Sequence, residues 1–265
     1  MNKLRMVGTG LVGIEHLTFS ALSHLKASKH VLLFFAPEGW KEVIQSIGKS
    51  FEEIDDLYRD GAQDLDNYDR IEAHVYESLA LHHDVALCIP GHPRVGVTIT
   101  GRFDASKSVR AFELAVVPAI SSFDTMINDL ELDPLRRGAS VVDANLLILF
   151  DYNLEPAMDH FIYHVCSIGT SKTHISDATK ESSIEFLKEK LLRHYATDHI
   201  VKLVRSRHHK SMAGAETIDM AIGSLEQLLP HITFSSTLYV PAASLRRERL
   251  NTDFLARFHA PANVE

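Results

Sequence analysis

The sequence predicts an α/β protein made of two α/β parts, the first with a mostly parallel sheet and the second with a mixed sheet. In the first half, short unbroken apolar runs alternate with segments whose apolar residues recur at helical spacing. Unbroken apolar runs are typical of parallel strands that helices cover on both faces. Beyond about residue 140 several runs alternate instead, as in Phe161, Tyr163 and Val165, which favours a sheet with one more polar face.

Each element of the first half is predicted from its own pattern. The predicted strands are 4–7, 30–36, 85–89 and 111–117. The predicted helices between them are 15–28, 38–48, 67–82 and 121–130. In the helix 38–48, for example, Trp40, Val43 and Ile44 share one face. This half is expected to form residues 1–140 of the protein.

The second half is expected to span residues 141–243 and to be followed by a tail at 244–265. Its predicted strands are 144–150, 160–168, 200–204 and 234–240. Its predicted helices are 180–194 and 218–229. The tail is charged and then rich in Pro, Ala and Asn, so we expect it to be partly loose.

Composition excludes several classes of protein. Apolar residues make up 45% and charged residues 23% of the 265 residues, as in ordinary globular proteins. Apolar runs stay far short of the ~20 residues of a membrane span, and we expect a cytoplasmic protein with no membrane contact. The net charge of −8 disfavours a nucleic-acid partner, and the basic stretch 202–211 is interpreted as a solvated helix end or loop. Cys88 and Cys166 are interpreted as core residues, and no spacing indicates a metal site.

Two glycine-containing loops follow predicted strands, at Gly8–Gly10 and at Gly91-His92-Pro93. Ligands of open α/β sheets bind beyond the carboxyl ends of strands, and glycine allows close approach to the backbone. The flanking prolines fix a rigid turn. A dinucleotide site is disfavoured because no acidic residue follows the second strand at the expected place. His92 is either a structural hydrogen-bonding residue or a catalytic one.

Several segments together resemble one family. They are "VGTGLVGIEHLT", "DVALCIPGHPRVGV", "VVPAISSFDTMINDLELDP", "HFIYHVCSIG" and "SSTLYVPA". They resemble the tetrapyrrole methylase fold of S-adenosylmethionine-dependent methyltransferases, and most of all the borosin-type peptide backbone N-methyltransferases. The resemblance runs from about residue 4 to 243. It implies a tetrapyrrole methylase-like fold with S-adenosylmethionine bound in a cleft between the two parts.

The resemblance also implies which residues contact the cofactor. These are Pro90, Gly91, His92, Val95, Val97, Ser121, Ser122, His164, Val165, Leu203, Val204, Ser236 and Thr237. Two departures accompany them, since Ala119 stands where the family usually has Gly, and His164 where Gln is common. A narrow apolar slot with polar groups at its rim is what an adenine ring requires.

The catalytic residues that the resemblance implies are Tyr58 and Tyr68. An amide nitrogen is a poor nucleophile because its lone pair is delocalised into the carbonyl group. Methylating it requires help in removing the proton, stabilisation of the carbonyl oxygen and alignment with the methyl group. Asp64 stands where the family has an arginine, and Asp55 and Pro90 stand where it has further tyrosines. The alternative interpretation of the two tyrosines is packed aromatic residues with satisfied hydroxyl groups.

Three functions remain open at this point. The first is N-methylation of a separate ribosomal precursor peptide by a homodimer, with Arg59 or Arg70 as the replacement cation. The second is methylation of a tetrapyrrole or another small molecule, and the third is binding of cofactor or peptide without turnover. The acidic stretch 52–66 either lines a channel for a basic substrate or is a solvated loop.

Overall fold

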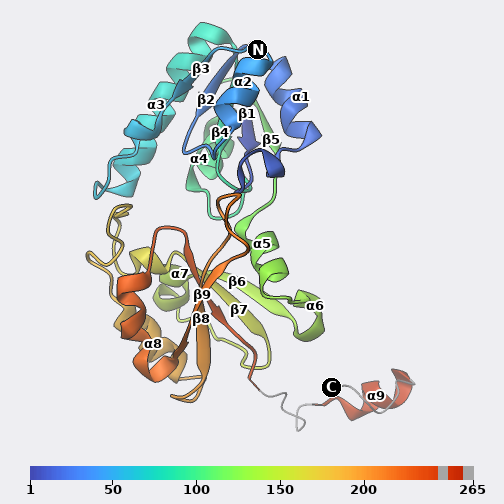
Figure 1. Cartoon of the computed structure of the whole chain (residues 1–265), viewed down its shortest axis with the longest axis vertical. Coiled ribbons are helices and arrows are strands. Elements are labelled where there is room, and N and C mark those ends of the chain that lie inside the picture. The colour runs from blue at the N-terminus through green and yellow to red at the C-terminus, as the bar shows by residue number, and fades with distance from the viewer. Residues whose placement is uncertain (244–249, 259–265) are drawn as a thin grey trace.

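The structure is a computed structural model in which residues 1–243 and 250–258 are described (Figure 1). It contains two sheets, each with helices packed against it, stacked along the long axis of the molecule. The predicted fold class, an N-terminal parallel sheet followed by a C-terminal mixed sheet, is confirmed. The predicted tail lies outside the described residues except for 250–258, which include the helix α9 (Thr252–Phe258).

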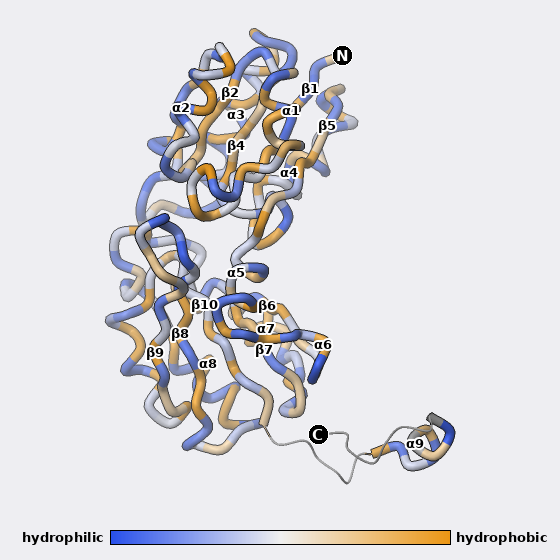
Figure 2. Tube along the Cα trace, turned by 45° about the vertical axis from the view of Figure 1, so that its right-hand side comes forward, coloured by the Kyte–Doolittle hydropathy of each residue, from blue (hydrophilic) through white to orange (hydrophobic). Residues whose placement is uncertain are grey.

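The first sheet is parallel throughout, with the strand order β3-β2-β4-β1-β5. Its strands are β1 (Asn2–Gly8), β2 (His30–Leu33), β3 (Phe51–Glu53), β4 (Asp84–Ile89) and β5 (Phe112–Val117). The central strands are buried almost completely, and Figure 2 shows hydrophobic residues along β2 and β4. All five carboxyl ends therefore meet at one edge of the sheet, which faces the second part (Figure 1).

Helices cover both faces of this sheet, because successive strand residues point to opposite sides. On one face, Val7 packs with α1 (Phe19–Ala27) and α2 (Trp40–Ser46), and Trp40 is fully buried. On the other, Leu4 and Met6 pack with α3 (Asp64–His82) and α4 (Thr98–Ser106). Short 3-10 turns, η1 (Gly13–His16) and η2 (Asp55–Leu57), lie in the loops after β1 and β3.

A partly buried ion pair connects β1 to the start of β4. The Arg5 guanidinium, 8% exposed as a residue, donates to both carboxylate oxygens of Asp84 at 2.7 and 2.8 Å. We expect Asp84→Ala to lower the free energy of unfolding by about 2 kcal/mol, because it leaves these charge-assisted hydrogen bonds unmade. Lys3→Ala, which breaks the exposed pair with Glu113, should cost less than ~1 kcal/mol. Urea denaturation of both variants tests this difference, and equal costs would contradict it.

The second sheet is mixed, with the strand order β6-β7-β10-β8-β9. Its strands are β6 (Ala139–Asp143), β7 (Asp159–Tyr163), β8 (Ile200–Arg205), β9 (Glu216–Ala221) and β10 (Ser236–Val240). Only β6 and β7 run parallel, and the other neighbours are antiparallel. The large core on one face includes α7 (Ala144–Leu149), η3 (Val165–Ser167), α8 (Ile184–Leu192) and η4 (Ile222–His231).

The other face of the second sheet is covered by α5 (Ser122–Asp129), which α6 (Pro134–Arg137) follows. Met126 of α5 is fully buried in a cluster with Phe161, Val204 and Tyr239. Since α5 already packs on the second sheet, we propose that the chain passes from one part to the other at 118–121. The boundary that the sequence predicted, between residues 140 and 141, lies farther along the chain.

Several predicted elements were wrong in type or extent. Residues 144–150 are not a strand but contain α7, because Asp143 caps a helix there by accepting a hydrogen bond from the Leu146 amide at 2.9 Å. The strand 160–168 ends at Tyr163, since His164 adopts a left-handed backbone conformation with φ of 58°. The helix 218–229 begins only at Ile222, after β9.

Within residues 1–243 and 250–258, no helix combines the length and the apolar character needed to cross a membrane.

Candidate active site

Three loops meet at the carboxyl edge of the first sheet, after β1, β4 and β5. Gly10 and Gly91 pair through two backbone hydrogen bonds, with N···O distances of 2.9 and 3.3 Å. A Cβ atom at Gly8 would lie 2.6 Å from the Gly91 carbonyl oxygen and 2.8 Å from the Ala119 side chain. The buried Thr9 hydroxyl donates to the Ile89 carbonyl. This close packing forms a backbone cradle that only glycine permits.

The loop 90–97 leads from β4 to α4 and contains several of the predicted cofactor contacts. Gly91 has a φ of 64°, which favours glycine. The His92 Nδ1 atom accepts a hydrogen bond from the Arg94 amide at 3.1 Å, so one ring nitrogen has a structural role. Pro90, like Val95 and Val97, is partly exposed. The loop therefore offers both backbone groups and apolar side chains to a ligand.

His164 of the second part lies against this loop. A Cβ atom at Gly96 would be 3.2 Å from the His164 Nε2 atom, while Nδ1 lies 2.7 Å from Asp143 Oδ2. Burial alone would raise the pKa of Asp143, but hydrogen bonds from His164 and the Leu146 amide lower it overall. The Asp143–His164 pair thus connects the second sheet to the loop 90–97.

Ser121 and Ser122 begin α5 at the passage between the two parts. The Ser121 side chain forms a capping box with Asp124, which explains its burial. The Ser122 hydroxyl lies 2.9 Å from the Tyr163 hydroxyl. Burial raises the pKa of Tyr163 to about 12, although the Ser122 contact opposes the rise. Ser122 therefore joins α5 to β7 beside His164.

The remaining predicted cofactor contacts lie inside the second part. Val165, Leu203, Val204, Ser236 and Thr237 are all buried. Val204 pairs with Thr237 across β8 and β10, and the Ser236 hydroxyl accepts a hydrogen bond from the Thr233 amide. The side chains of Val165 and Leu203 belong to the core. Any contact that these positions make with a ligand is expected to come from backbone atoms.

The two predicted catalytic tyrosines lie next to each other. The ring centroids of Tyr58 and Tyr68 are 6.2 Å apart, with an edge-on angle of 65°. The Tyr58 hydroxyl donates to Asp64 Oδ1 at 2.8 Å. Burial raises the pKa of both hydroxyl groups, and for Tyr68 a hydrogen bond with Thr98 opposes the rise. Thr98 directly follows the loop 90–97, so the tyrosines extend from that loop to Asp64.

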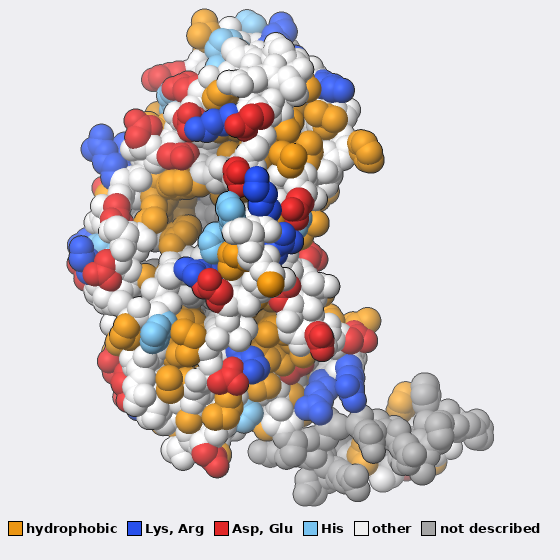
Figure 3. Space-filling model, in the orientation of Figure 1, with side chains coloured by type: hydrophobic (Ala, Val, Ile, Leu, Met, Phe, Trp, Pro, Cys, Tyr) orange, Lys and Arg blue, Asp and Glu red, His pale blue; other side chains and the backbone are white. Residues whose placement is uncertain are grey.

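Beside these tyrosines, residues 60–64 of the first part pair with residues 171–176 of the second part. We call these two segments the clasp. Gln63 and Lys172 form an antiparallel bridge. The Gly61 amide donates to the Thr173 carbonyl at 3.0 Å. The two segments face each other at the left of Figure 1, and Figure 3 shows a hollow beside them with hydrophobic side chains at its edge. The clasp therefore bounds one side of a cleft between the two parts.

Ion pairs connect the parts at a second place. Glu38, after β2, lies 2.9 Å from His209 and 3.0 Å from Lys210, and Arg207 lies 3.2 Å from Glu15. The prediction that the basic stretch 202–211 is a solvated helix end or loop was wrong: residues 202–205 belong to β8, and Arg207, His209 and Lys210 contact acidic residues of the N-terminal part. The two parts are therefore in contact at two places, through the clasp and through these ion pairs.

The acidic stretch 52–66 is used mostly within the chain itself. Its internal partners are His74 for Glu52, Lys41 for Glu53, the Phe35 amide for Asp55, the Ile175 amide for Asp60 and the Thr173 amide for Asp64. These contacts weigh against a channel for a basic substrate. Of the two candidate cations, Arg70 donates to the Leu57 carbonyl at 3.0 Å, whereas the Arg59 side chain is exposed.

The chain is similar to known methyltransferases in sequence. The model of the family described as Tetrapyrrole (Corrin/Porphyrin) Methylases matches residues 3–161, more than half of the chain. A methyltransferase and type II borosin cyclic peptide precursor of Phlebiopsis gigantea is 24% identical over 90% of this chain and 42% of its own length. A type III borosin counterpart of Anomoporia bombycina is 26% identical over 92% of this chain and 28% of its own length. The chain thus spans less than half of either relative.

Solved structures share the fold. Uroporphyrin-III-C-methyltransferase of Thermus thermophilus superposes with a TM-score of 0.61 at 20% identity, covering 91% of this chain and 92% of that enzyme. A structure of the Thermus thermophilus enzyme in complex with S-adenosylhomocysteine gives a TM-score of 0.59 at 15% identity, covering 90% and 97%. The family uses S-adenosylmethionine as its methyl donor. This chain, with its match over residues 3–161, belongs to the tetrapyrrole methylase family.

Proposed function

We propose that this protein transfers methyl groups from S-adenosylmethionine to backbone amide nitrogens of a ribosomally made precursor peptide. The observation that carries the proposal is the pair of partly buried tyrosines, Tyr58 and Tyr68, between the clasp and the loop 90–97. Similarity to borosin methyltransferases over 90% of the chain supports the same substrate class. Those relatives are named as both enzyme and precursor. We propose that the precursor here is a separate chain.

The residues at the carboxyl edge fit the methyl donor. Gly8 lets the loops after β1, β4 and β5 pack against one another, because a Cβ atom there would lie 2.6 Å from the Gly91 carbonyl oxygen, and this junction fixes the backbone of the loop 90–97 that is proposed to hold the cofactor. Val95 and Val97 provide apolar surface, and the His92 ring and the partly exposed Ser122 provide polar groups at the rim. When bound, S-adenosylmethionine supplies an electrophilic methyl group on a positively charged sulfur. The proposed role of these residues is to hold it facing the cleft.

The tyrosines are proposed to bind the acceptor amide. Burial keeps both hydroxyl groups protonated, because it disfavours the phenolate ion. A neutral hydroxyl can accept the N–H of an amide or donate to its carbonyl oxygen. Holding the amide in a fixed position next to the methyl group accelerates the reaction by removing the cost of orientation. Exclusion of water by Tyr58 and its aromatic neighbours strengthens these hydrogen bonds.

Incubation with candidate precursor peptides tests the proposal. The purified protein and S-adenosylmethionine are mixed with small peptides encoded beside the gene, and the products are sequenced by tandem mass spectrometry. The expected result is a mass gain of one methylene group per transfer, located on backbone nitrogen by the fragment ions. Methylation of a tetrapyrrole but of no peptide would overturn the substrate class. Binding of neither S-adenosylmethionine nor S-adenosylhomocysteine by calorimetry would overturn the methyltransferase itself.

A homodimer is proposed as the working form. The support is a set of apolar side chains exposed on α7 and at its end, namely Leu146, Leu149 and Phe150, each at least 44% exposed. Apolar residues gathered on one surface are typical of an interaction site. Light scattering at several protein concentrations measures the oligomeric state, and a monomer at all of them would contradict this part of the proposal.

A further inference from the structure

Asp64 belongs to the clasp, and one of its carboxylate oxygens contacts both Tyr58 and the facing clasp segment 171–176. It is the first residue of α3, and its Oδ1 atom accepts both the Tyr58 hydroxyl at 2.8 Å and the Thr173 amide at 3.1 Å. The amide of Asp64 itself donates to the Ser171 carbonyl at 2.9 Å. Both contacts with residues 171–173 cross between the two parts. The position of this carboxylate therefore depends on the closed clasp.

The contact with Asp64 determines which way the Tyr58 hydroxyl points. A hydroxyl group has one hydrogen to donate and two lone pairs with which to accept. A carboxylate only accepts, so the hydrogen in this contact comes from Tyr58. The ring is held in place by Phe34 and Phe35, at centroid distances of 6.1 and 6.4 Å, and by Tyr68. With its hydrogen directed to Asp64, the Tyr58 oxygen can only accept further hydrogen bonds, and the Thr173 side chain already donates to it, which leaves one lone pair for another donor.

We infer that Asp64 is a positioning residue that directs the Tyr58 hydroxyl hydrogen toward the clasp and so presents the Tyr58 oxygen as an acceptor for the N–H of the substrate amide. The inference rests on the proposed function, because it assumes an acceptor that carries an N–H group. It assigns Tyr58 and Tyr68 different tasks. Tyr58 accepts from the nitrogen that is methylated, whereas the Tyr68 hydroxyl contacts Thr98, directly after the loop 90–97, as well as Tyr58.

The orientation of the Tyr58 hydroxyl depends on whether the side chain at position 64 can accept a hydrogen bond. The resemblance to the borosin enzymes implies an arginine here, and a guanidinium group donates hydrogen bonds but accepts none. An arginine would leave the Tyr58 hydrogen free to point elsewhere. An aspartate fixes that hydrogen and also accepts the Thr173 amide, so clasp closure and hydroxyl orientation become coupled in this chain.

A measurement without any acceptor tests the contact itself. The protein is labelled with tyrosine carrying ¹³C at Cζ, and the Tyr58 signal is assigned by its absence in Tyr58→Phe. The chemical shift of this carbon reports the group to which the hydroxyl donates. We expect Asp64→Ala to move the Tyr58 signal at neutral pH. The matched control is Asp60→Ala, which removes another clasp carboxylate that accepts from Ile175 and Ser176 and should leave the signal in place. An unmoved signal in Asp64→Ala would overturn the inference.

Turnover tests the consequence of the contact, with the peptide that the precursor screen identifies as acceptor. We expect Asp64→Ala to lower kcat by about 100-fold, the order expected when a reacting group is misplaced by about 1 Å. KM and the affinity for S-adenosylmethionine should hardly change. Asp64→Asn should restore most of the rate, because its amide oxygen accepts the same two hydrogen bonds.

The outcomes separate this inference from the proposed function. Wild-type turnover in Asp64→Ala would show that the hydroxyl orientation is unimportant. An Asp64→Asn variant as slow as Asp64→Ala would show that the charge, not the accepted hydrogen bond, matters, and would also overturn the positioning role. If no peptide is methylated, the proposed function fails, and the Tyr58 chemical shift still decides whether Asp64 orients that hydroxyl.

Discussion

Tyr68→Phe is expected to reduce methyl transfer to the acceptor peptide by about 10²- to 10³-fold, the cost of removing one preorganised hydrogen-bond donor from the developing charge of a reacting amide. The substitution removes only the hydroxyl, so the ring keeps its edge-on contact with Tyr58 and its place against the core of the first part. The affinity for S-adenosylmethionine, measured by calorimetry, should stay nearly unchanged. Single-turnover rates with the peptide measure the chemical step directly.

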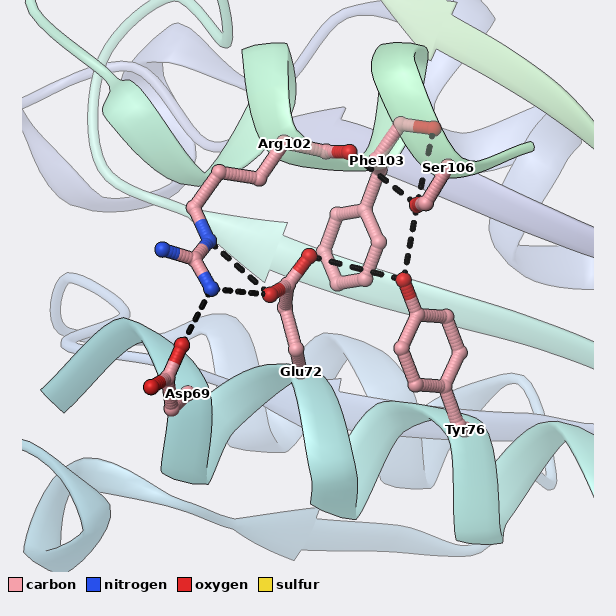
Figure 4. A network of polar contacts seen from close by, with 6 residues as sticks. All are labelled: Asp69, Glu72, Tyr76, Arg102, Phe103 and Ser106. Carbon is pink, nitrogen blue, oxygen red and sulfur yellow. Dashed lines mark hydrogen bonds and ion pairs between the residues drawn. The ribbon is translucent and has the colours of Figure 1, made fainter. Parts of the chain in front are cut away.

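Tyr76→Phe provides the matched control on the same helix. The Tyr76 hydroxyl lies 2.7 Å from the Ser106 hydroxyl, in a network of α3 and α4 side chains that also includes Glu72 and Arg102 (Figure 4). All of these partners belong to the first part, and no clasp or loop 90–97 residue is among them. Loss of this hydroxyl should lower stability by about 1 kcal/mol and leave turnover intact. Unaltered turnover in Tyr68→Phe would remove Tyr68 from the mechanism.

The first half of the fold could be predicted closely because its signals are long and consistent. The helix predicted at 67–82 is α3, extended by three residues at its start, and the strand at 85–89 is β4 with one more residue. Both belong to a sheet that is covered on two faces, where apolar runs are unbroken. The helix α4 was missed because its sequence, TITGRFDAS, contains few apolar residues and an internal glycine.

The second half was harder to predict because apolar runs there are short. Residues 144–150 are apolar enough for a buried strand or a buried helix, and periodicity alone does not separate the two. The deciding signal was Asp143, a helix-capping residue directly before the run. A helix cap at this position predicts α7, whereas the pairing of Asp143 with His164 is a tertiary contact that no local pattern indicates.

The candidate site was predictable where residues follow a strand and unpredictable where distant loops meet. The loop 90–97 follows β4, so its place at the sheet edge was inferred correctly. The clasp pairs segments more than 100 residues apart in sequence, and no local pattern in 171–176 indicates that its backbone binds residues 60–64. For the same reason, Asp64 was seen as a departure from the family pattern and not as a hydrogen-bond acceptor for Tyr58.

Gly8→Ala is expected to abolish binding of S-adenosylmethionine. The new methyl group would lie 2.6 Å from the Gly91 carbonyl oxygen, and 2.8 Å from both the Ala119 side chain and the Pro93 ring. None of these atoms is the end of a flexible side chain, so the loops after β1, β4 and β5 have to move apart. Such overpacking costs roughly 1–3 kcal/mol of stability. It also displaces the backbone groups that are proposed to contact the cofactor.

Gly101→Ala is the control that shows whether any glycine-to-alanine substitution impairs cofactor binding, or only one at the junction of the three loops. Gly101 lies in α4 and is exposed, and among the described residues no atom beyond its chain neighbours and the backbone of its own helix lies within 4 Å of the methyl group that alanine would add. Alanine should therefore raise stability by up to about 1 kcal/mol. At ~100 times its dissociation constant the cofactor stabilises the native state by roughly 2.7 kcal/mol. Thermal denaturation with and without S-adenosylmethionine should show this gain for the wild type and for Gly101→Ala, and none for Gly8→Ala. A full gain in Gly8→Ala would mean that the cofactor does not depend on the junction of the three loops, and the cradle would lose its assigned role.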